Sequence, residues 1–145
     1  MLKIKLLNEK AALPARASDG AAGYDLRACL DAPMTLKKGE IFAVPTGIAI
    51  ELPSKEYVAM LCARSGLAIK HGITLANAVG IIDSDYRGEI KVGLINLGSE
   101  EFVINPGERI AQMLIMPVSL PEIEISDDLS ETERGSGGFG STGRK

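Results

Sequence analysis

Short apolar segments alternate with turn signals along most of the chain. The segments 48–52 (IAIEL) and 90–94 (IKVGL) place apolar residues at every second position, which is the period of a half-buried β-strand. Turn signals such as SDGAAG (18–23), KKGE (37–40) and NPGE (105–108) separate segments of this kind. Many short strands at this spacing predict an all-β sandwich or barrel.

One segment departs from the strand pattern. RSGLAIKHG (64–72) predicts a short helix, with Ser65 as its N-cap and Gly72 as the residue that ends it. No Gly-rich turn joins a strand to a long helix, so a doubly wound α/β fold is not expected.

The last part of the chain reads as an arm. Residues 121–133 (PEIEISDDLSETE) are acidic and poor in core residues, which favours an extended segment. The end, RGSGGFGSTGRK (134–145), is either a disordered Gly/Ser tail or a loop whose backbone N–H groups wrap phosphates, with Phe139 free to stack on a flat base. We therefore expect a β domain over 1–120 and an arm with a mobile Gly-rich lid over 121–145.

Composition narrows the class of protein. The 145 residues fit one domain, and with 46% hydrophobic but only 4% aromatic residues its core must be mostly aliphatic. A net charge of -3 argues against non-specific binding to nucleic acid or to acidic membranes. The N-terminal segment is too charged for a secretory signal, and no apolar run approaches about 18 residues. We expect a cytoplasmic protein with no membrane partner.

The cysteines and the histidine limit the available chemistry. Cys29 and Cys62 are far apart in sequence and are expected to be reduced core thiols. His71 is the only histidine, so a His/Cys zinc site lacks ligands. If the protein is an enzyme, carboxylates must carry out the proton transfers.

Two segments offer ligand-binding groups, and each also has a purely structural interpretation. In one interpretation, Arg64 and the Ser65 hydroxyl point hydrogen-bond donors at one spot at the start of the helix, where an anion could bind. In the other, Ser65 is an ordinary N-cap and Arg64 is a surface arginine. The segment 76–92 is predicted to form a hairpin that projects Asn77, Asp83 and Tyr86. Asn77 suits recognition of a base edge and Asp83 suits activation of water. The alternative is that the segment is only a polar turn.

Polar residues also interrupt two apolar segments. Arg109 and Gln112 either bond buried backbone or reach a ligand. Asp25 and Arg27 either form an ion pair that supports the core or place a carboxylate beside a metal–phosphate cluster.

Taken in order, these segments resemble the five motifs of the trimeric dUTPases, the deoxyuridine triphosphate nucleotidohydrolases. The resemblance runs from about residue 20 to the end. Ala63 is a small departure, because members of the family often have proline before Arg-Ser-Gly. The matching segments are AGYDLRA (22–28), ARSGLA (63–68), NAVGIIDSDYRGEI (77–90), GERIAQMLI (107–115) and RGSGGFGSTG (134–143).

The resemblance implies a dUTP diphosphatase that converts dUTP and water to dUMP and pyrophosphate. Such an enzyme keeps uracil out of DNA and supplies dUMP for dTMP synthesis. Asp83 matches the general base that activates water, and Asp25 matches an acid near Mg²⁺ that acts through water. The matching substrate-binding positions are Arg64, Ser65, Gly66, Asn77, Ile81, Ile82, Asp83, Tyr86, Lys91, Gln112, Arg134, Phe139, Gly140 and Ser141.

Within this set, the resemblance gives different roles to different parts. Asn77 and the backbone of 81–83 read uracil, Tyr86 lies under the deoxyribose, and Phe139 stacks on the base. Arg64, Ser65, Gly66 and Gln112 bind phosphates from a neighbouring subunit, while Arg134, Gly140 and Ser141 enclose the phosphates from the tail. Lys91 lies where the family has a substrate contact, which is expected to be made by the backbone.

The resemblance also implies a distorted jelly roll with one short helix, assembled as a homotrimer with shared active sites. Extended, residues 121–133 can span roughly 40 Å, enough to reach a neighbouring subunit. Two rivals share this fold: a dCTP deaminase, and a non-catalytic trimer that senses nucleotides or binds proteins. A dCTP deaminase needs an acid at the base to activate water, and the segment that contains Asp83 has no glutamate before Glu89. A non-catalytic trimer would be expected to lack the catalytic acid or the tail, and both are present.

Overall fold

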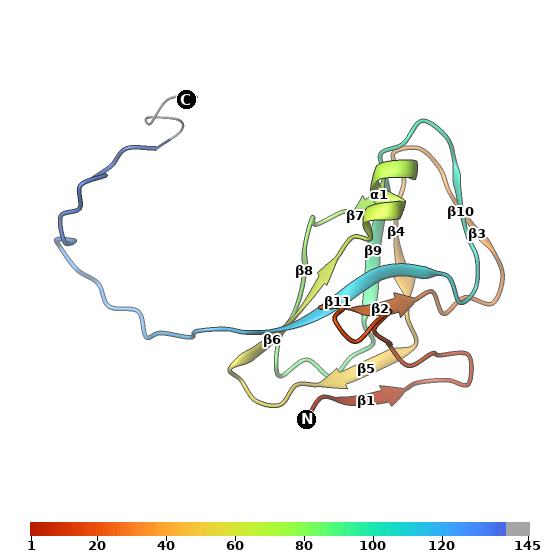
Figure 1. Ribbon diagram of the computed structural model, residues 1–145, viewed down its shortest axis with the longest axis horizontal. Helices are drawn as coiled ribbons and strands as arrows, with labels where there is room; N and C mark the ends of the chain where they lie inside the picture. Colours follow the sequence, from red (N-terminus) through yellow and green to blue (C-terminus); the bar gives the residue numbers. More distant parts are fainter. Residues whose placement is uncertain (139–145) are drawn as a thin grey trace.

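The computed structural model describes residues 1–138, and its ribbon is built almost entirely of short strands (Figure 1). One α-helix, α1, lies among the strands of the described residues. This confirms the all-β fold class with a single short helix. The elements are β1 (Lys3–Leu6), β2 (Tyr24–Arg27), β3 (Met34–Leu36), β4 (Ile41–Pro45), β5 (Ile48–Glu51), β6 (Tyr57–Cys62), α1 (Ser65–His71), β7 (Ile73–Leu75), β8 (Gly80–Ile82), β9 (Lys91–Asn96), β10 (Phe102–Ile104) and β11 (Arg109–Pro117).

The strands pair antiparallel in four small sheets. The largest has the order β2-β11-β6-β8, and a second has the order β4-β9-β7. The pairs β1-β5 and β10-β3 complete the body. Neighbours in a sheet are therefore mostly distant in sequence, so the fold depends on long-range pairing.

The core between the sheets is aliphatic, as the composition predicted. Its largest fully buried side chains include Leu26, Leu61, Leu94, Ile110 and Met113. No aromatic side chain is fully buried among the described residues; Tyr24 and Phe102 pack only at the edge of the core. Burying a side chain of this size contributes about 1.5–3 kcal/mol, so the stability is distributed over many similar contacts.

β9 shows the expected alternation, and β5 departs from it. Val92 and Leu94 point into the core from β9, as predicted. On β5, Ala49 is buried together with its neighbours Ile48 and Ile50, although β1 pairs with this strand only along its edge. The sequence pattern correctly predicted a strand, but it missed that this strand is covered on both sides.

The helix forms where it was expected, but its start differs. Arg64, and not Ser65, is the N-cap residue, and no side chain caps the helix. Ser65 is the first residue inside the helix, so its predicted capping role is wrong. Gly72 ends the helix as predicted: it is left-handed at φ 70°, and its N–H donates to Ala68 O.

Beyond β11 the chain leaves the body. Residues 118–138 form no helix or strand, and the ribbon extends far from the sheets (Figure 1). The apolar side chains of Ile123, Ile125 and Leu129 are almost fully exposed there. Within the described range, the single helix is much too short to span a bilayer.

The two cysteine predictions are borne out in part. Cys29 and Cys62 are free thiols, but both are only half-buried and lie outside the core cluster. Cys62 belongs to the outward face of β6, where it pairs in register with Gln112.

Gly72 gives a test of this packing. A Cβ on Gly72 would lie 2.4 Å from Gly98 N, whereas Gly39, at a similar φ of 76°, has nothing within 4 Å. We expect Gly39→Ala to cost about 1 kcal/mol of unfolding free energy through backbone strain alone. Gly72→Ala should cost about 3 kcal/mol or more, because the helix end must also move away from Gly98. Urea unfolding at equal protein concentrations measures both, and equal losses would contradict the close packing.

Candidate active site

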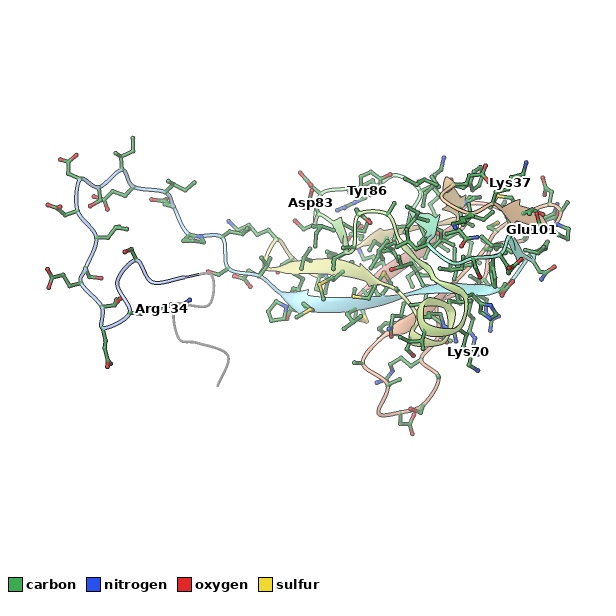
Figure 2. The ribbon with its side chains drawn as sticks, turned by 90° about the horizontal axis from the view of Figure 1, so that it is seen from above. Lys37, Lys70, Asp83, Tyr86, Glu101 and Arg134 are labelled. Atoms are coloured by element: carbon green, nitrogen blue, oxygen red, sulfur yellow. The ribbon has the colours of Figure 1, made fainter. Side chains whose placement is uncertain are left out.

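A cavity of about 400 Å³ opens beside the turn that follows β8. Asp83 lies at the start of this turn, and both Asp83 and Tyr86 lie at the same end of the body (Figure 2). The predicted residues that line the cavity are Ile81, Ile82, Asp83, Tyr86 and Lys91. The structure thus gathers five of the predicted binding positions around one hollow.

Local hydrogen bonds fix the shape of this turn. The Tyr86 hydroxyl donates to Glu89 O at 3.0 Å, which folds the ring back over Gly88. A Cβ on Gly88 would lie 2.4 Å from the Tyr86 oxygen, so glycine is required for this ring position. Arg87 points its guanidinium back to the carbonyls of Ser84 and Tyr86, at 2.8 and 3.0 Å.

Glu89 also lines the cavity and was not predicted as a site residue. Its carboxylate accepts from the Gly47 N–H at 2.9 Å and lies 3.8 Å from the Lys91 ammonium. These contacts fasten the turn to the loop between β4 and β5. The only sequence signal was a charged residue directly before the buried Ile90, which is too common to be diagnostic.

A second cluster of polar side chains forms where β2, β11 and the residue before α1 meet. The Asp25 carboxylate accepts a hydrogen bond from Arg109 Nη1 at 2.9 Å and lies 3.3 Å from Arg64 Nε. Arg64 Nη1 in turn donates to Arg109 O at 3.0 Å. The Arg109 side chain therefore pairs with a carboxylate and not with buried backbone, and its predicted contact with a ligand stays a prediction.

Gln112 completes this cluster from β11. It pairs in register with Asp25 on one side and with Cys62 on the other. Its Nε2 donates to Ala63 O at 3.1 Å, which holds the residue before Arg64. Gly23 lets it approach, because a Cβ there would lie 2.9 Å from Gln112 Oε1. Arg27 does not pair with Asp25; its guanidinium donates to Gly107 O.

The two clusters lie at opposite ends of β6. Ile82 pairs with Ala59 near the start of the strand, so Asp83 lies beside Val58. Arg64 follows the far end of the strand, six residues beyond Val58. At about 3.3 Å per residue, the backbone at Val58, beside Asp83, lies roughly 20 Å from the backbone at Arg64.

The remaining predicted residues within 1–138 do not line the Asp83 cavity and make no side-chain hydrogen bond within the Asp25 cluster. Asn77 is exposed in the turn after β7. Arg134 is on the arm, far from the body (Figure 2), and its Nε donates to Gly137 O at 2.8 Å. Ser65 and Gly66 follow Arg64 at the exposed start of α1. Phe139, Gly140 and Ser141 lie outside the described residues.

His71 takes no part in either cluster. It ends α1, and its ring lies 5.0 Å from that of Phe102, away from the Asp83 cavity. Within residues 1–138 the histidine therefore offers no base to the cavity, and the Asp83 and Glu89 carboxylates are the acidic groups that line it.

The implied Mg²⁺ fits this donor set only in part. No group of three or more His, Cys, Asp or Glu side chains within residues 1–138 is arranged to hold a metal ion. Both carboxylate oxygens of Asp25 already face arginines. Mg²⁺ keeps several waters and takes substrate phosphates as ligands, so the residues fit an ion that is held mainly by a polyphosphate and water.

The family model for dUTPase matches residues 9–143. The chain belongs to the dUTPase family. Members of this family depend on a metal ion.

A curated relative of this dUTPase-family chain is the deoxyuridine 5'-triphosphate nucleotidohydrolase of Burkholderia multivorans. It is 54% identical over 145 residues, covering 99% of this chain and 98% of the relative. Identity at this level over the full length supports one common fold and one common arrangement of motifs.

Solved dUTPase structures share the fold. A point mutant of the dUTPase from phage 80alpha has a TM-score of 0.88 at 28% identity, over 97% of this chain and 98% of that one. The Staphylococcus bacteriophage 80alpha dUTPase with dUPNHPP has a TM-score of 0.86 at 29% identity, over 99% and 98% of the two chains. These similarities confirm the jelly-roll-like fold predicted for this chain.

Proposed function

We propose that this chain hydrolyses dUTP to dUMP and pyrophosphate. The observation that carries the proposal is the cavity that Asp83 and Tyr86 line, in a chain of the dUTPase family. A carboxylate beside a hollow of nucleoside size, with no histidine near it within the described range, suits water activation by an acid. A pyrophosphate-release assay across dUTP, UTP, dTTP and dCTP tests the activity and its specificity together.

Asp83 is the general base in this proposal. Its carboxylate takes a proton from a water molecule, whose oxygen attacks the α-phosphorus. The bond from the α-phosphorus to the bridging oxygen breaks, and pyrophosphate leaves with its electron pair. The exposed position of Asp83 at the mouth of the cavity gives water access to it.

The segment 76–92 provides selectivity for the nucleoside. It does not form the predicted hairpin, because β8 pairs with β6 whereas β9 pairs with β4 and β7. Asn77 and the backbone of 81–83 read the uracil edge, and a pocket that donates to a uracil carbonyl leaves a group unpaired with cytosine. Tyr86 packs under the deoxyribose, where a 2′-hydroxyl would clash. The bond from Tyr86 to Glu89 O supports this role by holding the ring in one place. Lys91 lines the same cavity, and its expected contact with the substrate is through the backbone.

The polyphosphate binds to the Arg64 cluster and to the tail. Arg64, Ser65, Gly66 and Gln112 supply donors to it, and bound Mg²⁺ neutralises part of its charge. Arg134, Phe139, Gly140 and Ser141 belong to a lid formed by residues 121–145, which closes over base and phosphates.

The active site is shared between subunits of a homotrimer. Asp83 must lie one water from the α-phosphorus, and Arg64 must touch a phosphate oxygen. The backbone separation of roughly 20 Å along β6 supports this division, because one subunit could bridge it only with an extended Arg64 side chain, whereas Arg64 is held back by Asp25 and Arg109 O. In this proposal, Asp83 of one chain meets Arg64 of another.

The outward face of the largest sheet supports this assembly. Residues of β6 and β11 that pair across this face are apolar toward one end: Met60 with Leu114, and Val58 with Met116. Ile81 extends the face onto β8 and is 56% exposed in the single chain. An apolar sheet face of this extent is typical of a subunit interface, and Asp25 and Gln112 lie at its polar end.

Substitution of the base tests the mechanism. We expect Asp83→Asn to bind dUTP with near wild-type affinity and to lower kcat by about 10²–10⁴-fold. Asp85→Asn is the matched control, because Asp85 is an exposed acid in the same turn that does not line the cavity. A kcat near wild type for Asp83→Asn would remove Asp83 from the role of base.

The contact between Gly88 and Tyr86 tests the discrimination against ribose. Gly88→Ala should push the Tyr86 ring away from its position and lower the preference for dUTP over UTP by about tenfold. Gly93→Ala is the control, since a Cβ on Gly93 meets nothing within 4 Å. The ratio of kcat/KM values for the two nucleotides is the measurement. An unchanged ratio in Gly88→Ala would exclude this role of the ring.

Truncation tests the lid. A chain without residues 134–145 should fold and assemble as the full chain does, and turn over dUTP roughly hundredfold more slowly, because the closed site is not completed. Removal of 144–145 alone should leave the rate unchanged. Full activity in the longer truncation would show that closure by the tail is not needed.

A further inference from the structure

Arg64 is held by three different parts of the chain. Its Nε lies 3.3 Å from Asp25 Oδ1 on β2, and its Nη1 donates to the carbonyl of Arg109 on β11. The residue before it is fixed as well, since Gln112 donates to Ala63 O. The Arg64 side chain is only 27% exposed, so its direction is set by packing as well as by these bonds.

Asp25 is the centre of this arrangement. Its side chain is 17% exposed, and its two oxygens divide between two arginines: Oδ1 faces Arg64 and Oδ2 accepts from Arg109 at 2.9 Å. Without this carboxylate, the guanidinium groups of Arg64 and Arg109, whose side chains are 27% and 43% exposed, would lie near each other with no opposite charge between them. The half-buried Arg64 side chain would then favour a position nearer to water, where repulsion between like charges is weaker.

The contacts leave a defined part of Arg64 for a ligand. With Nε toward Asp25 and Nη1 on a carbonyl, no protein acceptor is recorded for Nη2 within residues 1–138. A planar guanidinium that is fixed on one side presents its other N–H groups in one direction. This is the preorganised form in which arginine binds phosphate oxygens best.

We propose that Asp25 is a positioning residue that aligns Arg64 for the polyphosphate of the substrate, independently of any metal ion. The inference rests on the proposed dUTPase function and adds to it a role for Asp25 that does not pass through Mg²⁺. Asp25 touches neither the reacting atoms nor the phosphates in this role, and it acts through Arg64.

The direction in which dUTP affinity changes when the Asp25 carboxylate is removed in EDTA distinguishes the positioning role from a role near the metal ion. In EDTA, an acid whose only role is near the metal no longer helps binding, and its negative charge repels the phosphates. Its removal should then leave the affinity for dUTP unchanged or raise it. An acid that aligns an arginine gives the opposite result, because its removal releases Arg64 from the binding geometry.

The experiment is calorimetric titration of the full-length protein with dUTP and with dUMP, both in EDTA. Asp25→Asn should weaken dUTP binding roughly tenfold, the loss of about one charge-assisted hydrogen bond, and change dUMP binding little. The matched control is Asp31→Asn, which removes an acid that pairs with Lys10 on the exposed surface. It should change neither affinity.

A double-mutant cycle identifies the residue through which Asp25 acts. In an Arg64→Ala background, Asp25→Asn should change dUTP affinity by less than about twofold, since there is no guanidinium left to align. The same tenfold loss in both backgrounds would overturn the proposal. So would an Asp25→Asn protein that binds dUTP in EDTA as well as the wild type, or better.

A second variant of Asp25 and an activity assay of the wild type separate failure of the positioning role from misfolding and from failure of the proposed function. If Asp25→Asn does not fold, Asp25→Glu keeps the charge but moves the carboxylate by one methylene, and the proposal again requires weaker dUTP binding in EDTA. Pyrophosphate release by the wild type with Mg²⁺ is measured in parallel. Absence of that activity refutes the proposed function, whereas normal activity with unweakened EDTA binding by the Asp25 variants refutes only the positioning role.

Discussion

The pairing of β6 with a strand on each side is the constraint on which the rest of the structure depends. β11 lies along one edge of β6 and β8 along the other, in a fixed antiparallel register. Because side chains alternate between faces, this register sends Leu61 and Met113 into the core and Met60 and Leu114 outward. A shift by one residue would exchange these faces and expose the core.

The same register fixes the two chemical clusters. β8 delivers Asp83 beside the start of β6, while the end of β6 leads directly into Arg64. β11 brings Gln112 and Arg109 to that end, and β2 adds Asp25. The separation between a carboxylate suited to water activation and an arginine suited to phosphate is therefore a property of the sheet. In the proposed function, assembly brings the two clusters of different subunits together and also covers an apolar face.

Much of the site was visible in the sequence, and the exceptions have physical reasons. Asp83 and Tyr86 were found because turn residues with side chains suited to chemistry interrupt an apolar pattern. Glu89 was missed because its partner, the Gly47 N–H, lies on a loop distant in sequence. Ser65 was wrongly expected to cap the helix, since Arg64 already adopts the extended backbone of an N-cap and its side chain turns to Asp25 instead.

The sequence by itself determined the strands, the helix with its glycine end and the aliphatic core, because each follows from local periodicity or from composition. Only the tertiary structure decided which polar residues meet. Asp25 and Arg109 are distant in the chain, and their ion pair exists because β2 and β11 are neighbours in one sheet. Whether Asp25 would pair with Arg27 or with the two other arginines could not be read from spacing, since strand order, unlike strand position, is set by long-range packing.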